Sequence, residues 1–144
     1  MVDEEEEFPA IFDKFCSWLK HDLQLVHPNL MDYDTEEQPK FAFVTCGDWD
    51  LKYMLPSQCD TSQITLPHYF TKWINVKKAF AMSCGPTGIG SFPRSLSEML
   101  RNLGLYFEGR PHSGIDDVKN IVTVVQKLGK ERCHIFENTS SITK

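Results

Sequence analysis

The segment GRPHSGIDDVKN, residues 109–120, contains residue types that can perform acid–base and metal chemistry. His112 lies five residues before Asp117, and Asp116 directly precedes that carboxylate. A histidine titrates near neutral pH and can act as a general base, while carboxylate oxygens are ligands that Mg²⁺ prefers. A plainer structural interpretation also fits, in which an ordinary helix begins with an acidic first turn and His112 is a surface loop residue.

The helix predicted over residues 114–129 separates the two aspartates. At about 100° per residue, Asp117 lies at the edge of the apolar side. That side is formed by Ile121, Val124 and Leu128 and is extended by Val118, Val122 and Val125. Asp116 falls on the solvated side. Ser113 and Asp116 match the capping box S-x-x-[DE], in which Asp116 reaches back to the Ser113 amide. The pattern favours Asp117 as a ligand and gives Asp116 a structural role.

A second acidic cluster, Asp48 and Asp50, follows the apolar run 41–46. Such a run is typical of a strand that is buried on both faces, as in a parallel sheet covered by helices. Acids just past the carboxyl end of that strand lie where open α/β sheets usually bind ligands. A solvated turn with Asp as a helix N-cap fits equally well. The intervening Trp49 is predicted to pack rather than to stack on a base.

The remaining pattern predicts alternating helices and strands, which we expect to position these two clusters. The spacing of Phe8, Phe12, Phe15 and Leu19 indicates a helix over residues 8–25. Further elements are predicted at 50–58 (helix), from Pro67 (helix), at 74–79 (strand), after Ser95 (a capped helix that stops near Gly104) and at 137–144 (a frayed tail). No repeat and no linker interrupts this order.

Composition indicates one globular domain and excludes several classes of protein. The chain has 144 residues, 41% hydrophobic residues and a formal net charge of −5, which argues against bulk coating of nucleic acid. Five cysteines without a C-x-x-C spacing favour a reducing compartment over a disulfide or zinc framework. No apolar run is long enough for a membrane span, and the acidic start is unlike a signal peptide. We expect the cytoplasm, the nucleus or both.

Three segments in consistent order then resemble a known family. These are FVTCGDWDLKYMLPSQC, YFTKWINVKKAF and GRPHSGIDDVKNI. They are similar to the C-terminal half of the Eri-type 3′–5′ exonucleases, which include the histone-mRNA 3′-exonuclease and prion-interactor-type relatives. This family belongs to the DEDDh superfamily. The resemblance covers nearly the whole chain and implies an α/β, RNase H-like fold.

The resemblance also implies roles for individual residues. Asp50 matches the middle aspartate, His112 the catalytic histidine and Asp117 the last aspartate of the family pattern. Leu51 is a candidate nucleotide-binding residue. Two Mg²⁺ or Mn²⁺ ions about 4 Å apart would clamp the scissile phosphate, with His112 as general base on the attacking water. The product would be a nucleoside 5′-monophosphate from an RNA 3′ end. We expect residues 50, 112 and 117 to converge on one cavity at the rim of the sheet.

The chain departs from the family in lacking the first motif, Asp-x-Glu on a strand. Asp3 and Glu5 have that spacing, but no apolar strand surrounds them. The predicted architecture is therefore an N-terminally truncated exonuclease domain over residues 1–132, without its first three strands, followed by a tail over 133–144. We expect little activity from this chain alone. We also expect poor solubility, or a protein partner that completes the sheet. The alternative is a non-catalytic RNA- or protein-binding isoform or fragment that regulates a full-length relative.

Overall fold

The computed structural model describes residues 6–26, 41–84, 92–132 and 134–142. These residues form two compact units. The first holds the described residues up to Ala42 together with Trp49–Thr71, and we call it the helical unit. The second holds Phe43–Asp48 and the described residues from Lys72 onward, and we call it the sheet unit.

The helical unit is built from short helices around an aromatic core. Its elements are α1 (Phe8–Ser17), the π-helical turn η1 (Trp18–Asp22), the π-helical turn η2 (Asp50–Met54), α2 (Leu55–Thr61) and the 3₁₀ turn η3 (His68–Phe70). The Phe12 ring lies 5.2 Å from that of Phe8 and 5.4 Å from that of Phe70. The amphipathic helix predicted over residues 8–25 is thus confirmed for α1, and η1 continues it. The helix predicted from Pro67 is only one 3₁₀ turn.

The sheet unit contains a three-stranded sheet in the order β1-β2-β3. Its elements are β1 (Phe43–Thr45), β2 (Lys72–Asn75), α3 (Val76–Cys84), α4 (Leu96–Asn102), α5 (Gly114–Arg132) and β3 (Ser140–Ser141). β1 and β2 run parallel, with Phe43 opposite Trp73, whereas β3 is antiparallel to β2. The parallel pairing predicted from the apolar run 41–46 is confirmed, but the predicted burial of this strand on both faces is wrong, since all three residues of β1 are partly exposed.

Helix α3 corrects the strand predicted at 74–79. The strand ends at Asn75, and residues from Val76 onward are helical. The side chain of Asn75 accepts a hydrogen bond from the Lys77 amide at 3.0 Å, which is the contact of a helix N-cap. Buried Ala79 and Phe80 then face the core at helical spacing. The helix therefore begins two residues after the start of the predicted strand.

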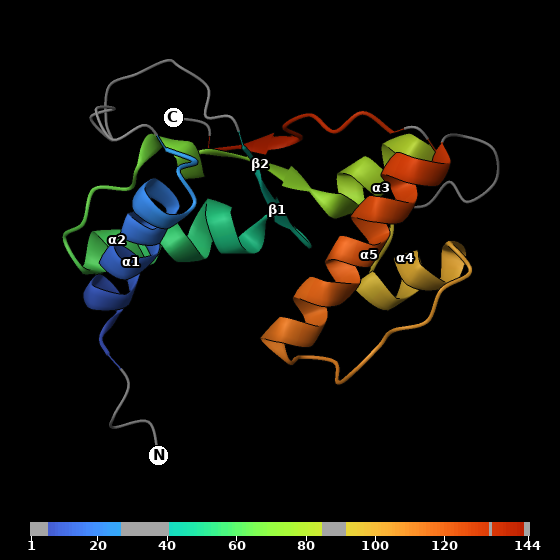
Figure 1. Cartoon of the computed structure of the whole chain (residues 1–144), viewed down its shortest axis with the longest axis horizontal. Coiled ribbons are helices and arrows are strands. Elements are labelled where there is room, and N and C mark those ends of the chain that lie inside the picture. Colours follow the sequence, from blue (N-terminus) through green and yellow to red (C-terminus); the bar gives the residue numbers. More distant parts are fainter. Residues whose placement is uncertain (1–5, 27–40, 85–91, 133, 143–144) are drawn as a thin grey trace. The chain divides into compact units, whose positions relative to one another are not determined.

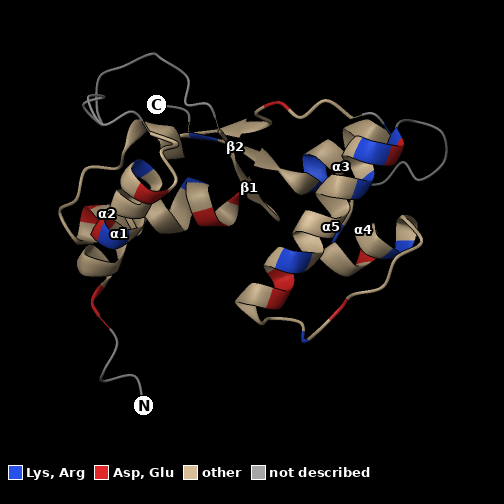
Figure 2. Ribbon diagram, viewed as in Figure 1, with Lys and Arg blue, Asp and Glu red and all other residues tan. Residues whose placement is uncertain are grey.

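The helices α3, α4 and α5 pack together around the core of the sheet unit, as Figure 1 shows. The fully buried side chains of this core come from all three helices: Val76, Phe80, Met99, Leu100, Val124 and Leu128. Helix α5 bears acidic residues in its first turn and basic residues in its last (Figure 2). This arrangement complements the helix dipole.

The start of α4 follows the predicted capping pattern. Ser95 accepts a hydrogen bond from the Glu98 amide at 3.1 Å. The Glu98 carboxylate returns to the Arg94 amide at 2.7 Å, one residue before the position that the capping box expects. Gly104, at φ +72°, follows the end of the helix as predicted.

The C-terminal segment is attached to the sheet, so the prediction of a frayed tail is wrong for residues 139–141. Ser140–Ser141 pair with β2, and the Thr139 amide donates to the Trp73 carbonyl at 3.0 Å. The division between domain and tail at residue 132 stays a prediction. Within the described part of the chain, no helix is both long and apolar enough to cross a membrane.

Candidate functional site

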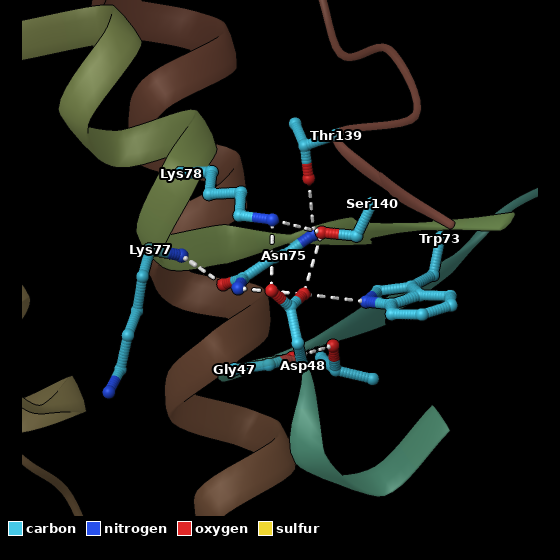
Figure 3. Close-up of polar contacts among 9 residues, drawn as sticks. Gly47, Asp48, Trp73, Asn75, Lys77, Lys78, Thr139 and Ser140 are labelled. Atoms are coloured by element: carbon cyan, nitrogen blue, oxygen red, sulfur yellow. Dashed lines mark hydrogen bonds and ion pairs between the residues drawn. The ribbon is translucent and has the colours of Figure 1, made fainter. Parts of the chain in front are cut away.

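The first acidic pair begins with Asp48, whose carboxylate is held inside the sheet unit. Its Oδ1 accepts hydrogen bonds from Trp73 Nε1 at 3.0 Å, Asn75 Nδ2 at 3.0 Å and Ser140 Oγ at 2.6 Å. Its Oδ2 lies 2.9 Å from Lys78 Nζ (Figure 3). These donors come from β2, α3 and β3. The carboxylate thus joins the end of β1 to three other elements.

These contacts favour the ionised form of Asp48. Partial burial opposes ionisation most strongly, but the hydrogen bonds from Ser140, Lys78, Asn75 and Trp73 together outweigh it and lower the pKa of Asp48 to about 2. A carboxylate whose lone pairs are occupied by four donors has little capacity left for a metal ion. Asp48 is therefore structural, but not as the predicted N-cap in a solvated turn, because Trp49 occupies the N-cap position of η2 and makes no side-chain cap hydrogen bond.

Asp50 and Leu51 lie in the helical unit, at the start of η2. The Asp50 side chain is exposed, whereas Leu51 is buried in the core of its unit. Trp49 is 67% exposed and its ring lies 5.4 Å from that of Tyr53. The predicted packing of Trp49 is thus limited to its contact with the Tyr53 ring, and both rings are exposed to solvent.

His112 and Asp117 lie in the sheet unit, on either side of the start of α5. His112 is exposed and has a φ of +66°, in the left-handed region that few residues other than glycine adopt. Asp117 is half-buried in the first turn, and its amide donates to the Ser113 carbonyl at 2.8 Å. The prediction that Asp117 lies on the inner side of the helix is consistent with burial of Val124 and Leu128. The extension of the apolar arc is wrong for Val118 and Val122, which are exposed.

Asp116 has a different role from the predicted capping box. Its Oδ2 accepts a hydrogen bond from the Arg110 amide at 3.1 Å, whereas the Ser113 amide, which a capping box would pair with Asp116, donates to the Arg110 carbonyl at 3.2 Å. This backbone hydrogen bond lowers the pKa of Asp116 most strongly. Desolvation opposes that effect, and a side-chain hydrogen bond from Ser113 adds to it. The carboxylate therefore turns back over the loop that carries His112.

The donor chemistry of the remaining carboxylates suits a hard divalent cation, but their number does not complete a site. Asp50 and Asp117 offer oxygen ligands of the kind that Mg²⁺ and Mn²⁺ bind. Across the described residues, no three histidine, cysteine or carboxylate side chains are grouped as a metal centre requires. Because Asp50 and Asp117 belong to different units, the predicted convergence of residues 50, 112 and 117 stays a prediction.

Comparison with protein families matches the Exonuclease model, of RNase T type, to residues 1–125. The chain belongs to this exonuclease family. It is 41% identical over 142 residues to ERI1 exoribonuclease 3 of Homo sapiens, covering 97% of this chain and 37% of that relative. It is 32% identical over 143 residues to 3′-5′ exoribonuclease 1 of Homo sapiens, covering 95% and 35%. The chain thus spans little more than a third of the length of these curated relatives.

Solved structures agree with this assignment. The nuclease domain of 3′hExo, a DEDDh family member bound to rAMP, superposes with a TM-score of 0.73 at 29% identity, covering 96% of this chain and 62% of that one. A 3′-exonuclease solved for its 3′-end specific recognition of the histone mRNA stem-loop gives 0.72 at 29% identity, covering 92% and 53%. The fold is therefore the mixed α/β, RNase H-like fold of the DEDDh exonucleases, as the sequence motifs predicted.

Sequence reasoning missed the partners of the two structural aspartates. Asp48 binds Ser140, which is 92 residues away, so no local pattern reveals the contact. Asn120, buried at 2% exposure within α5, was not singled out at all. The signal that could have revealed it is an asparagine on the apolar side of a helix, because a buried amide needs hydrogen-bond partners.

Proposed function

We propose that this chain is the later part of a 3′–5′ exoribonuclease domain, with residues 1–132 as the domain and 133–144 as the segment that follows. The observation that carries the proposal is 41% identity to ERI1 exoribonuclease 3 across nearly the whole chain. The order of the acidic and histidine motifs supports it. The substrate class is RNA with an accessible 3′ end, by analogy with the relative solved on the histone mRNA stem-loop. Cytoplasm, nucleus or both remain the proposed location.

In this proposal each residue has one task. Asp50 and Asp117 are the metal ligands, His112 takes the proton from the attacking water, and Leu51 borders the nucleotide. Mg²⁺ or Mn²⁺, when bound, would stabilise charge on the attacking and leaving oxygens of the phosphodiester. The exposed rings of Trp49 and Tyr53 offer a surface on which an RNA base can stack.

In isolation, the chain should bind metal weakly and show little nuclease activity. Two carboxylates hold a divalent cation poorly, and this sequence has no Asp-x-Glu on an apolar strand to supplement them. A protein that adds strands to the sheet is the proposed partner. The second candidate function, favoured by this incomplete ligand set, is a non-catalytic RNA- or protein-binding isoform or fragment that regulates a full-length relative.

Manganese titration followed by NMR tests the proposed ligands without requiring turnover. We expect Mn²⁺ at millimolar concentration to broaden the amides around Asp117 and Asp50 selectively, because the paramagnetic ion lies beside them. Asp117→Asn should remove the broadening, whereas Glu131→Gln, at the other end of α5, should not. Uniform broadening that is unchanged in Asp117→Asn would remove the basis for a metal-dependent function.

An RNA-trimming assay separates the two candidate functions. With labelled single-stranded RNA and Mn²⁺, we expect no detectable 3′ shortening by the chain alone. Robust trimming that His112→Ala abolishes would show that the chain is a complete enzyme. RNA binding without trimming, weakened by Trp49→Ala, would favour the binding module.

A further inference from the structure

The loop that carries His112 is exposed, yet its backbone is held from beneath by the helix that follows it. The backbone groups of Glu108 and Arg110 are joined to α5 by hydrogen bonds with two of its side chains. Upstream, Phe107 packs against the core of the sheet unit. Downstream, the Ser113 amide donates to the Arg110 carbonyl at 3.2 Å, which closes the turn around His112.

Asn120 makes the deeper of the two attachments. Its side-chain oxygen accepts from the Glu108 amide at 3.0 Å, and its nitrogen donates to the Glu108 carbonyl at 2.8 Å. The same nitrogen donates to the Asp116 carbonyl at 2.8 Å. Only 2% of this residue is exposed, so these bonds are shielded from competing water. A single buried amide thus satisfies both backbone groups of one loop residue.

Asp116 makes the second attachment, one turn closer to His112. Its carboxylate accepts the Arg110 amide, two residues before the histidine. Gly109 provides the space for this contact. A Cβ there would lie 2.6 Å from Asp116 Cγ, and the backbone has a φ of +89°, which disfavours any side chain. The fit between Gly109 and Asp116 is a close approach that no larger residue allows.

We propose that Asp116 and Asn120 are the positioning residues of His112. The inference rests on the proposed function, in which His112 is the general base. A general base must lie within hydrogen-bond reach of the proton it removes, and exposed loops are ordinarily mobile. Two side chains on a rigid helix fix this loop against α5, and that same helix carries Asp117 one residue after Asp116. The two adjacent aspartates therefore have different roles: Asp116 holds the loop, and Asp117 remains available to bind a ligand.

An ordinary helix cap does not account for these contacts. In a capping box the third residue of the helix reaches back to the N-cap amide, whereas Asp116 reaches the Arg110 amide, three residues before Ser113. Asn120 lies in the second turn of α5, beyond the region that caps serve. Both side chains therefore act on the loop rather than on the helix end.

Hydrogen exchange and histidine NMR on the whole chain test the proposal. The Cε1–H signal of His112 is assigned by comparison with His112→Gln. In Asp116→Ala, we expect the Arg110 amide to exchange about tenfold faster, because a charge-assisted hydrogen bond is lost. The His112 signal should sharpen and move towards that of an unstructured peptide. Asp116→Asn keeps an acceptor oxygen. Its Arg110 amide should therefore exchange within about threefold of the wild-type rate, and its His112 signal should return towards the wild-type position.

Two further variants keep the result interpretable. Glu131→Ala, at the far end of α5, is the control and should leave the loop unchanged. If the amides of Val124 and Leu128 also exchange faster in Asp116→Ala, the helix itself has opened. In that case Gly109→Ala is the variant that tests the positioning role. That variant displaces the carboxylate from outside the core, so it should loosen Arg110 and His112 while the helix amides stay protected.

The outcomes separate this inference from the proposed function. The positioning role would be overturned if Asp116→Ala left both the exchange of the Arg110 amide and the His112 signal as in wild type. Where Gly109→Ala is the deciding variant, the same result in that variant would overturn it. This holds even if Mn²⁺ still broadens the amides around Asp117. A loosened loop in a chain that shows no selective Mn²⁺ broadening would instead overturn the proposed function and leave the attachment of the loop established.

Discussion

In each of the two acidic pairs, Asp48/Asp50 and Asp116/Asp117, one carboxylate forms hydrogen bonds that stabilise the fold. Asp48 is occupied by donors from three elements, while Asp50 is exposed. Asp116 holds a loop amide, while Asp117 is not engaged in that contact. The helical pattern assigns a structural role to Asp116 because both residues belong to one helix, but the predicted difference in exposure is not seen, since both are partly buried. It leaves the first pair undecided, since the partners of Asp48 are distant in sequence.

Asp48 should make the free energy of unfolding depend on pH in the acidic range. Its folded pKa of about 2 lies below the ordinary aspartate value of 3.8, so its contribution to stability is fully present above about pH 4 and is lost as the pH falls towards 2. A difference of nearly two pKa units corresponds to about 2 kcal/mol. In urea unfolding, Asp48→Asn should be about 2 kcal/mol less stable than wild type at pH 6. This gap should narrow towards pH 2.

The control for this measurement is Asp60→Asn, which removes an exposed negative charge from α2. A gap between wild type and Asp48→Asn that is the same at pH 6 and pH 2.5 would contradict the assignment. It would mean that ionisation of the Asp48 carboxyl group contributes nothing to stability.

At the scale of elements, two helices end in the same way with different residues. At the end of α4, Gly104 has a φ of +72°, and the Leu105 amide bonds the Leu100 carbonyl. At the end of α2, Gln63 has a φ of +55°, and the Ile64 amide bonds the Cys59 carbonyl. Both are Schellman motifs, in which glycine is favoured at the left-handed position. Gln63 therefore carries strain that Gly104 avoids.

Gln63→Gly should stabilise the chain. Removing the Cβ relieves the left-handed strain, and the greater freedom of glycine when unfolded offsets part of the gain, leaving about 0.5–1 kcal/mol. Chemical unfolding monitored by circular dichroism measures the difference. Gly104→Gln is the reciprocal variant and should be destabilising by at least as much. A loss of stability in Gln63→Gly would mean that the glutamine side chain makes a contribution larger than the strain.

Local signals predicted the elements that depend on local contacts. Ser95 and Glu98 predicted the start of α4, and the apolar run before Gly47 predicted β1. The start of α3 was missed because Asn75 lies in a β-rich context, WIN, and its N-cap role was overlooked. The 3₁₀ turn after Pro67 is too short to leave a periodic pattern.

At the scale of the whole molecule, the family resemblance provided what periodicity could not. The parallel pairing of β1 with β2 follows from an apolar run, but the addition of β3 does not. The sequence ENTSSITK is polar and has no alternation, so it reads as a tail. Its attachment depends on Asp48 and Asn75, more than 60 residues upstream. Contacts of that separation are visible only in three dimensions.

Removal of residues 137–144 should therefore destabilise the chain rather than trim a loose end. The deletion removes the bond from the Asn75 amide to Thr139 Oγ1, the bond from the Thr139 amide to the Trp73 carbonyl, and that from Ser140 to Asp48. At about 1 kcal/mol for each neutral bond and more for the charged one, the loss is about 3 kcal/mol. The exposed edge of β2 should also promote aggregation.

Urea unfolding and light scattering measure the two effects of this truncation. Ile135→Ala is the matched control in the same segment, since this side chain is 80% exposed and its loss should change stability little. Thr139→Val keeps the shape and removes one acceptor, so it should reproduce about a third to a half of the destabilisation by leaving the Asn75 amide unpaired. A truncated chain as stable and as soluble as the full one would mean that β3 makes no net contribution. In that case Asp48 would be held by Lys78 and β2 alone.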